Sequence, residues 1–383
     1  MHHEWARTLV GLLDEHIGYV ADDRRLACFR RALVSLVRPG DVVADVGCGT
    51  GILGLLCLQA GAAKVWGIES TAMTEVAREA MARAGLGDRY ACIRGHSLQV
   101  ELPQPVDIAI CDHVGFFGFD YDIIATLGDA RRRFLKPGGR IVPSRIRLQL
   151  GAVQSPRCRD KAEAWRAVEV PSEYRWLRDF GINTKLPMML TPDEILGEPA
   201  ILGTIDLGAD NPPFLSFQAE LRVARDGVLD GVAGWFECEL SEGIWMTNSP
   251  LSGAAIAREQ AFLPIDQPLA VKAGEILNVS IMARPAGNLI AWTLEARASG
   301  RRFNHSAWKG LVLAPEDIVR FQPDRVPRLS RAGLARRIVM EYCDGRRTNR
   351  EIEQEVLRDH PQLFPSREAI SSFILGALGR DSE

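Results

Sequence analysis

The sequence predicts an α/β protein in which a doubly wound parallel sheet is followed by an antiparallel β-barrel-like domain and a small C-terminal helical module. Three observations predict this order. Strand and helix patterns alternate from Val42 to Val142, short alternating apolar segments follow Pro143, and short helical patterns follow Arg328. The expected domains are residues 1–40, 41–144, 145–325 and 326–383.

The first segment, residues 5–38, is predicted to be helical because apolar residues recur at helical spacing, as at Leu26, Phe29 and Leu33. Gly18 is a weak point at which we expect the segment to divide into two helices. Pro39-Gly40-Asp41 then ends it.

Strands alternating with helices predict a parallel sheet with right-handed crossovers for the second segment. The first strand begins at Val42, and the others are expected at 64–68, 90–93, 106–111 and 140–142. The expected helices are 52–60, 74–83 and 122–135.

The third segment is predicted to be antiparallel because short runs of alternating apolar and polar residues dominate it. The expected strands are 145–153, 214–223, 231–239, 276–283 and 289–296, with a Trp-rich helical piece at 157–180. In the last segment we expect Thr348 to cap a helix, with Glu351 completing a capping box.

Composition excludes several classes of function. The 383 residues include 46 Lys+Arg and 49 Asp+Glu, a net charge of -3, whereas a nucleic-acid-binding protein needs a concentrated basic surplus. The eight cysteines form no C-x-x-C pair, so neither a zinc site nor a disulfide is expected. The longest apolar run, 52–63, is too short to cross a bilayer, and the first residues lack a secretory pattern. We expect a reduced, cytoplasmic protein without a metal, nucleic-acid or membrane partner.

The most informative stretch is the loop Gly47-Cys48-Gly49-Thr50-Gly51, which follows an apolar strand and precedes a helix. Glycine at alternate positions lets the backbone pass close beneath a ligand, where a Cβ would collide. Glu69 ends the next strand, where a carboxylate can accept two hydrogen bonds from a ribose diol. The pattern therefore predicts a nucleotide-type ligand at the carboxyl edge of the sheet.

The G-x-G-x-G spacing, with Asp45 two positions before the first glycine, resembles the class I S-adenosylmethionine-dependent methyltransferases and their Rossmann-like domain. The loop lacks the spacing of pyrophosphate-binding loops, and no Lys-Ser/Thr follows it, which argues against NAD and ATP. The resemblance implies S-adenosylmethionine as cofactor and S-adenosylhomocysteine as product. The cofactor-binding residues expected from this stretch are Asp45, Gly47, Cys48, Gly49, Gly51 and Glu69.

Over roughly residues 10–290, the order of parts resembles the protein arginine methyltransferases. The N-terminal helix carries Asp22-x-x-Arg25-x-x-x-Phe29, similar to the family helix that closes over the cofactor. The resemblance implies that Arg25 pairs with the methionine carboxylate of the cofactor, a charge-assisted contact. It also implies a homodimer, for which residues 164–180 could serve as the arm.

The substrate side departs from the family pattern. Family members bind the substrate guanidinium with an acidic pair, and here Asp112, which also faces the cofactor, occupies the first position but Tyr121 the second. Asp120 and Asp122 flank Tyr121, and a one-residue slip could bring either carboxylate inward. The family signature Thr-His-Trp falls on Ile256-Ala257-Arg258. A guanidinium is best bound by two carboxylates in a planar fork, so this pocket looks rebuilt.

Two further family positions differ in the same way. The methionine that lines the arginine pocket falls on Tyr19, and the glutamate that holds the adenine amino group falls on Leu98. Ser97 is then the nearest polar side chain for the adenine.

Aromatic side chains stand where the second acid is missing, and we expect them to surround a flat substrate ring. The expected pocket residues are Tyr19, Phe116, Phe117 and Phe119, and the expected catalytic residues are Asp112, His113 and Tyr121.

We therefore predict methylation of a small aromatic nitrogen heterocycle, an indole-type ring methylated at carbon or nitrogen in secondary metabolism. Asp112 would orient and deprotonate the substrate N–H, which requires burial to raise its pKa. His113 is the second candidate for the proton acceptor, and His16 is a weaker one. Two alternatives remain: an arginine or peptide N-methyltransferase with an atypical acceptor pocket, and a cofactor-binding protein without catalysis.

Residues 326–383 have a winged-helix-like pattern and are similar to the small peptide-clamping domains of modified-peptide biosynthesis. The resemblance implies a contact with a peptide, and a packing or interface role is the alternative.

Overall fold

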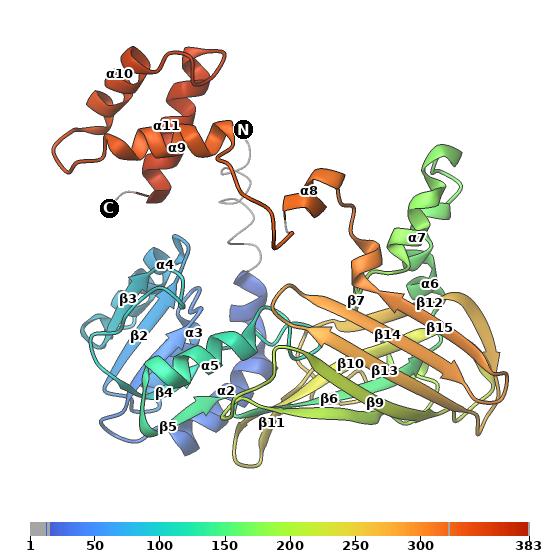
Figure 1. Ribbon diagram of the computed structural model, residues 1–383. Helices are drawn as coiled ribbons and strands as arrows, with labels where there is room; N and C mark the ends of the chain where they lie inside the picture. Colours follow the sequence, from blue (N-terminus) through green and yellow to red (C-terminus); the bar gives the residue numbers. More distant parts are fainter. Residues whose placement is uncertain (1–12, 14–15, 321, 382–383) are drawn as a thin grey trace. The chain divides into compact units, whose positions relative to one another are not determined.

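The parallel sheet forms as expected in the computed structural model, which describes residue 13 and residues 16–320 and 322–381. Its strand order is β3-β2-β1-β4-β5, with every neighbouring pair parallel (Figure 1). The strands are β1 (Val42–Val46), β2 (Lys64–Glu69), β3 (Tyr90–Arg94), β4 (Val106–Ile110) and β5 (Leu135–Val142). The helices between them are α3 (Ile52–Gln59), α4 (Met73–Arg83) and α5 (Ile123–Arg133).

The strand order reverses between β1 and β4, because the chain first builds outward through β2 and β3 and then returns to pair β4 with β1. The loops that leave the carboxyl ends of β1 and β4 therefore diverge from each other and leave a crevice between them. The glycine loop follows β1, and Asp112 follows β4. The topology thus places the two most informative sequence features at the same edge of the sheet.

Helix α2 (Asp23–Leu36) joins the two halves of the larger unit. It buries Leu26, Phe29 and Leu33 at helical spacing, and it contacts α3 on one side and strands β10 and β11 of the antiparallel domain on the other (Figure 1). Residues 16–21 are also helical, so the break between the two helices lies at Asp22 and not at Gly18. Asp22 is the N-cap of α2, with its carboxylate accepting a hydrogen bond from the Arg25 backbone N–H at 3.0 Å.

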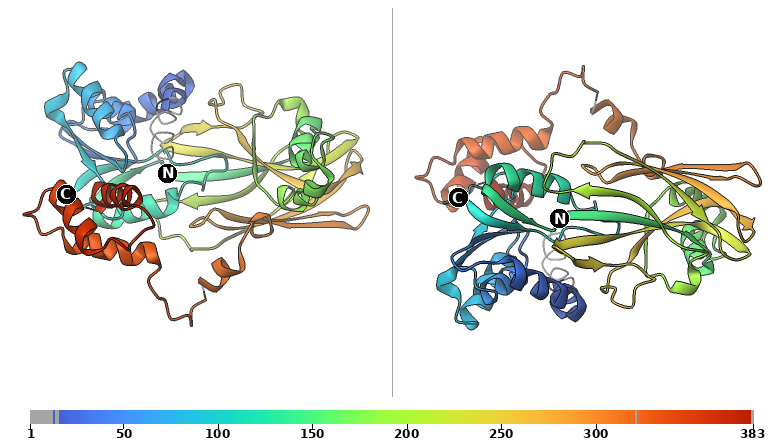
Figure 2. Two further views of the ribbon diagram at one scale, coloured as in Figure 1. Left: turned by 90° about the horizontal axis from the view of Figure 1, so that it is seen from above. Right: turned by 90° about the horizontal axis from the view of Figure 1, so that it is seen from below.

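The antiparallel domain consists of two sheets, ordered β7-β12-β10-β6-β8, with β11 paired to β10, and β15-β14-β13-β9. Both views in Figure 2 show their long strands running side by side. The strands are β6 (Arg145–Val153), β7 (Leu186–Met188), β8 (Ala200–Asp206), β9 (Leu215–Arg222), β10 (Gly227–Ser241), β11 (Ile244–Thr247), β12 (Gln260–Val271), β13 (Ile276–Arg284), β14 (Leu289–Ala296) and β15 (Arg301–Ser306).

Five of these strands were not expected from the sequence: β7, β8, β11, β12 and β15. Strand β12 contains Pro264 and Pro268, β7 and β11 are very short, β8 contains Gly203, and β15 is rich in charge. Each of these properties weakens the sequence pattern by which a strand is predicted. The segments form strands because they pair with neighbouring strands in the folded chain. The Trp-rich piece is helical as predicted, with α6 (Pro156–Ala162) and α7 (Arg178–Gly181) separated by short 3₁₀ turns.

The described chain divides into two compact units at Leu311/Val312. The second contains α8 (Pro315–Arg320), α9 (Arg331–Glu341), α10 (Asn349–Asp359) and α11 (Arg367–Asp381), coloured orange to red in Figure 2. Val339, Val356 and Ile374 belong to its own buried core. Thr348 and Glu351 form the predicted capping box of α10. The described residues of this unit contain helices and no strand, so the wing of a winged helix is not among them.

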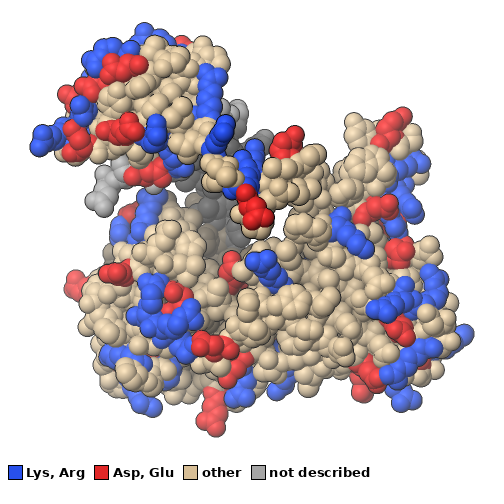
Figure 3. Space-filling view, viewed as in Figure 1, with Lys and Arg blue, Asp and Glu red and all other residues tan. Residues whose placement is uncertain are grey.

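Acidic and basic side chains are interspersed over the face that Figure 3 shows, in keeping with the net charge of -3.

The loop between β4 and α5 is anchored to the antiparallel domain by Phe117. Phe117 is fully buried, and its ring lies against Gly234 of β10, where an added Cβ would overlap the ring. Asp120 holds the same loop from inside, because its Oδ2 accepts hydrogen bonds from the backbone N–H groups of Phe116 and Phe117 at 2.9 and 2.7 Å. Lys185 pairs with the other oxygen of Asp120.

We expect Gly234→Ala to lower the free energy of unfolding by roughly 1–3 kcal/mol, because the new methyl group must displace a buried aromatic ring. Gly253→Ala is the matched control, since a Cβ there meets nothing within 4 Å. Denaturant unfolding of both variants measures the difference, and equal stability would contradict the proposed anchoring of the loop.

Candidate active site

A cavity of about 770 Å³ lies at the carboxyl ends of β1, β2 and β4. The glycine loop, the loop after β4, the helical residues before α2 and residues 257–259 of the antiparallel domain all line it. A ligand pocket of this size holds a cofactor together with an acceptor group.

The glycine loop forms one wall of the cavity. Gly47, Gly49 and Gly51 all have positive φ angles, 71°, 50° and 78°. An added Cβ at Gly47 would overlap the His113 imidazole, and one at Gly49 would lie 2.7 Å from His16. Glycine is therefore required here both by backbone conformation and by close approach of neighbouring groups.

Glu69 is held in place beside this loop. Its Oε2 accepts a hydrogen bond from the Gly49 N–H at 3.1 Å, and its Oε1 accepts one from the Thr71 N–H at 2.8 Å. Each carboxylate oxygen keeps a lone pair for a ligand hydroxyl. The three glycines of the loop, which have no Cβ, and the oriented carboxylate of Glu69 fit a nucleoside cofactor.

Asp45 lies beneath the loop and is 1% exposed. Its Oδ2 accepts a hydrogen bond from the Gly54 N–H at 2.8 Å. Burial raises the pKa of Asp45 to about 7, against the lowering effect of this hydrogen bond. Asp45 therefore changes its charge near neutral pH.

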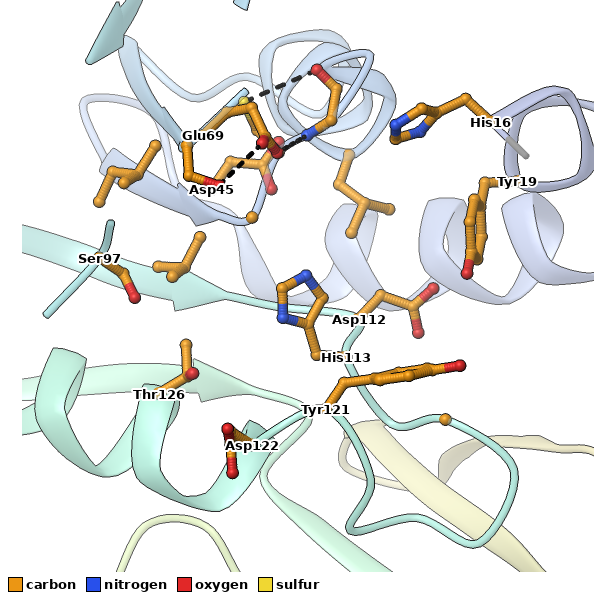
Figure 4. A pocket seen from close by; sticks show the side chains of 18 of the residues that line it. His16, Tyr19, Asp45, Glu69, Ser97, Asp112, His113, Tyr121, Asp122 and Thr126 are labelled. Carbon is orange, nitrogen blue, oxygen red and sulfur yellow. Dashed lines mark hydrogen bonds between the residues drawn. The ribbon is translucent and has the colours of Figure 1, made fainter. Parts of the chain in front are cut away.

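Two ends of the cavity can be distinguished. The end away from Asp112 is lined by Ser97, and by Asp122 and Thr126 from the start of α5. Cys48 and Leu98 also line the cavity. Figure 4 shows Ser97, Asp122 and Thr126 close to one another and apart from Asp112. Asp122 is the N-cap residue of α5, but its φ is 56° and its side chain caps no backbone N–H. A non-glycine residue in this conformation is uncommon, and here it turns the carboxylate to the cavity.

Asp112 lies at the other end, paired with two arginines. Its Oδ2 accepts hydrogen bonds from Arg25 Nε at 2.5 Å and from Arg258 Nη2 at 3.2 Å, and the three side chains are 4%, 8% and 11% exposed for Arg25, Asp112 and Arg258. Burial alone would raise the pKa of Asp112, but the charges of Arg25 and Arg258 outweigh it and hold the pKa below its ordinary value. The expectation that Asp112 deprotonates a substrate N–H by a raised pKa is therefore wrong.

Sequence reasoning missed Arg258. The available signal was its place in the sequence, because a charged residue stands at the Trp position of the Thr-His-Trp signature. The Arg258 guanidinium also lies over the Tyr19 ring, 5.6 Å from its centroid. Its Nη1 and the Oδ1 of Asp112 are buried without a hydrogen-bond partner among the described residues.

The structure brings only part of the predicted aromatic set into the cavity. Tyr19, Phe116 and Tyr121 line it, and Figure 4 shows Asp112 between the rings of Tyr19 and Tyr121. Phe117 and Phe119, at 0% and 2% exposed, belong to the core and do not line the cavity, so their prediction as pocket residues is wrong. The turns at Gly115 and Gly118, with φ of 61° and 86°, direct these two rings inward.

His113 lies between the glycine loop and Asp112 (Figure 4). Cys111, by charge and hydrogen bond, and then Asp112 and Glu69 raise the pKa of His113 to about 9. The imidazole therefore carries a proton at neutral pH and is a poor proton acceptor there. His16 lines the cavity as well, with its ring centroid 6.1 Å from that of Tyr19.

The described residues contain no group of three or more His, Cys, Asp or Glu side chains that could hold a metal ion. In the same part of the chain, no helix is long and apolar enough to cross a bilayer.

Residues 43–139 match the family model described as a methyltransferase domain. Protein arginine N-methyltransferase 1 of Chlamydomonas reinhardtii is 30% identical over 238 residues, which cover 60% of this chain and 69% of that protein. The corresponding protein of Dictyostelium discoideum is 26% identical, covering 70% and 81%. The probable protein arginine N-methyltransferase 6 of Arabidopsis thaliana is 32% identical, and there the chain spans less than half of the relative's length, 43%.

Solved structures show the same fold. The Trypanosoma brucei PRMT1 enzyme–prozyme heterotetrameric complex with AdoHcy matches with a TM-score of 0.67 at 20% identity, covering 76% of this chain and 96% of that one. The crystal structure of Arabidopsis thaliana protein arginine methyltransferase 10 matches with a TM-score of 0.67 at 23% identity, covering 77% and 98%.

These relatives contradict the predicted methylation of an indole-type heterocycle, and that prediction is wrong. The small-molecule acceptor that accompanied it has no support. The findings favour the alternative, an arginine or peptide acceptor bound in an atypical pocket.

Asp45 yields a test of the buried site. The pKa of Asp45 is about 7 in the folded chain and near 3.9 in the unfolded chain. Between about pH 4 and about pH 7, the folded state therefore binds more protons than the unfolded state. The free energy of unfolding should therefore fall as pH rises from about 4 to about 7, by up to ~4 kcal/mol. Asp45→Asn keeps an acceptor for the Gly54 N–H and should remove this slope, making the variant the more stable protein at pH 8. Urea unfolding at pH 5 and pH 8 measures it, with exposed Asp88→Asn as control. An unchanged slope in Asp45→Asn would show that Asp45 titrates normally.

Proposed function

Because the chain belongs to the protein arginine N-methyltransferase family, we propose that it transfers a methyl group to an arginine side chain of a protein or peptide. It is an S-adenosylmethionine-dependent methyltransferase. The observation that carries the proposal is the buried, ionised Asp112 at the end of β4, in the same cavity as the glycine loop.

The cofactor end of the cavity is proposed to be held by the residues expected from the sequence. When bound, S-adenosylmethionine supplies an electrophilic methyl group on a sulfonium. Glu69 would accept hydrogen bonds from the ribose diol, and the Gly47–Gly51 backbone would approach the methionine portion. Arg25 uses Nε for Asp112 and Nη1 for the Tyr19 carbonyl at 2.8 Å, which leaves Nη2 for the methionine carboxylate.

Asp112 is proposed to hold the acceptor guanidinium through its carboxylate, of which Oδ1 is buried without a partner among the described residues. A lowered pKa keeps the carboxylate ionised, and its charge stabilises the extra positive charge that develops on the guanidinium until an N–H proton passes to water. Tyr19 and Tyr121 flank the carboxylate, at the place where the acceptor would bind.

The assembly proposed by resemblance is a homodimer formed through the arm of residues 164–180. This arm exposes several aromatic side chains, with Trp165, Tyr174 and Trp176 at 42%, 55% and 59%.

The eight cysteines are free, which supports a reducing compartment such as the cytoplasm. A peptide contact through residues 326–383 stays a prediction.

The function is tested by incubating the protein with methyl-labelled S-adenosylmethionine and an Arg-rich peptide, followed by mass analysis of the modified residue. We expect label on arginine nitrogen. Asp112→Asn should lower turnover about 100-fold or more, because the charge facing the guanidinium is lost, while exposed Glu198→Gln should not change it. Product formation on peptides without arginine, and none on Arg-rich peptides, would overturn the proposal.

Asp122 is proposed to accept a hydrogen bond from the adenine amino group, in place of the glutamate whose position is Leu98. Its carboxylate faces the cavity beside Ser97 and Thr126 and caps no helix N–H. Asp122→Ala should weaken S-adenosylhomocysteine binding roughly 10- to 100-fold, the cost of one charge-assisted hydrogen bond. The analogue of S-adenosylhomocysteine in which inosine replaces adenosine lacks this amino group. It should bind Asp122→Ala no more weakly than it binds the wild-type protein. Calorimetry measures both, and an equal loss for the two ligands would exclude a contact with the amino group.

A further inference from the structure

The acceptor end of the cavity holds more positive than negative charge. Asp112 carries one negative charge, and it faces the two buried guanidinium groups of Arg25 and Arg258. An arriving arginine would add a third cation around one carboxylate. A guanidinium is best bound by two carboxylates, so the resting arrangement around Asp112 does not yet fit the proposed acceptor.

The two arginines differ in how firmly they are held. Arg25 donates to Asp112 at 2.5 Å and to the Tyr19 carbonyl, and it starts from a rigid helix. Arg258 makes one longer contact, 3.2 Å, and its Nη1 is buried without a partner among the described residues. An unsatisfied buried donor costs free energy, so Arg258 is the group that a ligand can displace.

The backbone that carries Arg258 is fixed on all sides. The Ala257 N–H donates to Asp22 Oδ2 at 3.1 Å, and Gln260 Nε2 donates to the Arg258 carbonyl at 3.0 Å. Asn248 Nδ2 donates to the Glu259 carbonyl at 2.7 Å. These contacts hold the backbone of residues 257–259, and Arg258 and Glu259 both line the cavity.

Glu259 is a carboxylate that sequence reasoning did not consider. No hydrogen bond or ion pair of its side chain occurs among the described residues, although it lines the same cavity as Asp112. It comes from the antiparallel domain, whereas the family's second acid comes from the loop after β4, where this chain has Tyr121. Glu259 therefore offers the negative charge that the loop lacks.

We infer that Arg258 and Glu259 determine acceptor binding: Arg258 occupies Asp112 as an internal guanidinium that the substrate guanidinium displaces, and Glu259 supplies the second carboxylate. This inference rests on the proposed function. Once Arg258 turns away, Asp112 and Glu259 balance the charges of Arg25 and the bound arginine. Methyl transfer then proceeds as proposed above, with Glu259 acting as a binding residue.

The test uses Arg258→Met, which keeps the length of the side chain and removes the competing charge. With S-adenosylhomocysteine bound, calorimetry should show N-ethylguanidinium binding about tenfold more tightly to Arg258→Met than to the wild-type protein. Glu259→Gln should weaken N-ethylguanidinium binding about tenfold relative to the wild-type protein. The double variant, Arg258→Met with Glu259→Gln, should lose the tighter binding of Arg258→Met. Exposed Glu242→Gln serves as the charge-matched control. Affinity for S-adenosylhomocysteine should stay within about twofold in all variants.

The outcomes separate the inference from the proposed function, because guanidinium binding is measured without turnover. No methylation of Arg-rich peptides by any variant, together with the expected binding pattern, would overturn only the function. Equal or weaker guanidinium binding in Arg258→Met overturns the inference. A tenfold loss of S-adenosylhomocysteine affinity in that variant also overturns it, because Arg258 would then hold the cofactor carboxylate. Arg258→Lys, which keeps a charge but not the planar fork, checks that the effect is not a loss of folding, and thermal melting is recorded for each variant.

Discussion

The pairing of Asp112 with two arginines is the interaction on which the rest of the site depends. Arg25 comes from the N-terminal helix, Asp112 from the end of β4, and Arg258 from the chain that leads into β12. Breaking a buried ion pair by removing one partner is costly, because the other charge is left uncompensated. One carboxylate thus holds three parts of the chain in position, and one end of the cavity lies where they meet.

The cofactor half of the site could be predicted from the sequence because its requirements are local. Gly47 and Gly49 are needed for a backbone conformation and for close approach, and both reasons are readable from their spacing. Glu69 ends a strand, so the sheet itself determines where it lies. Asp112 could be found in the same way, since it follows the last residues of β4. The fold was predictable for similar reasons, through strand and helix patterns that repeat over short distances.

The acceptor half depends on contacts between distant parts of the chain, and no local pattern reports them. Phe117 reads like Phe116 in the sequence, yet it packs against Gly234, more than a hundred residues away, and leaves the pocket. Asp122 lies next to Tyr121, but the left-handed backbone at both residues directs them to different ends of the cavity. Arg258 lies just before β12, a strand that the sequence pattern did not predict because it contains Pro264 and Pro268. The direction of each side chain was the missing information, and it follows from tertiary packing.

An internal arginine beside Asp112 changes the energetics of binding another arginine. In an open site, a guanidinium must lose its water and the carboxylate must lose its own, and both losses oppose binding. Here Asp112 has already been desolvated by Arg258, at a cost met when the chain folded. The substrate exchanges one guanidinium for another at the same carboxylate, so the net charge around Asp112 stays the same during the exchange. The remaining cost is the transfer of Arg258 to a new environment, offset by its own hydration and by the second carboxylate of Glu259. A pocket with one acid fewer in its loop can therefore still select a guanidinium, provided that Glu259 supplies the second carboxylate when Arg258 leaves.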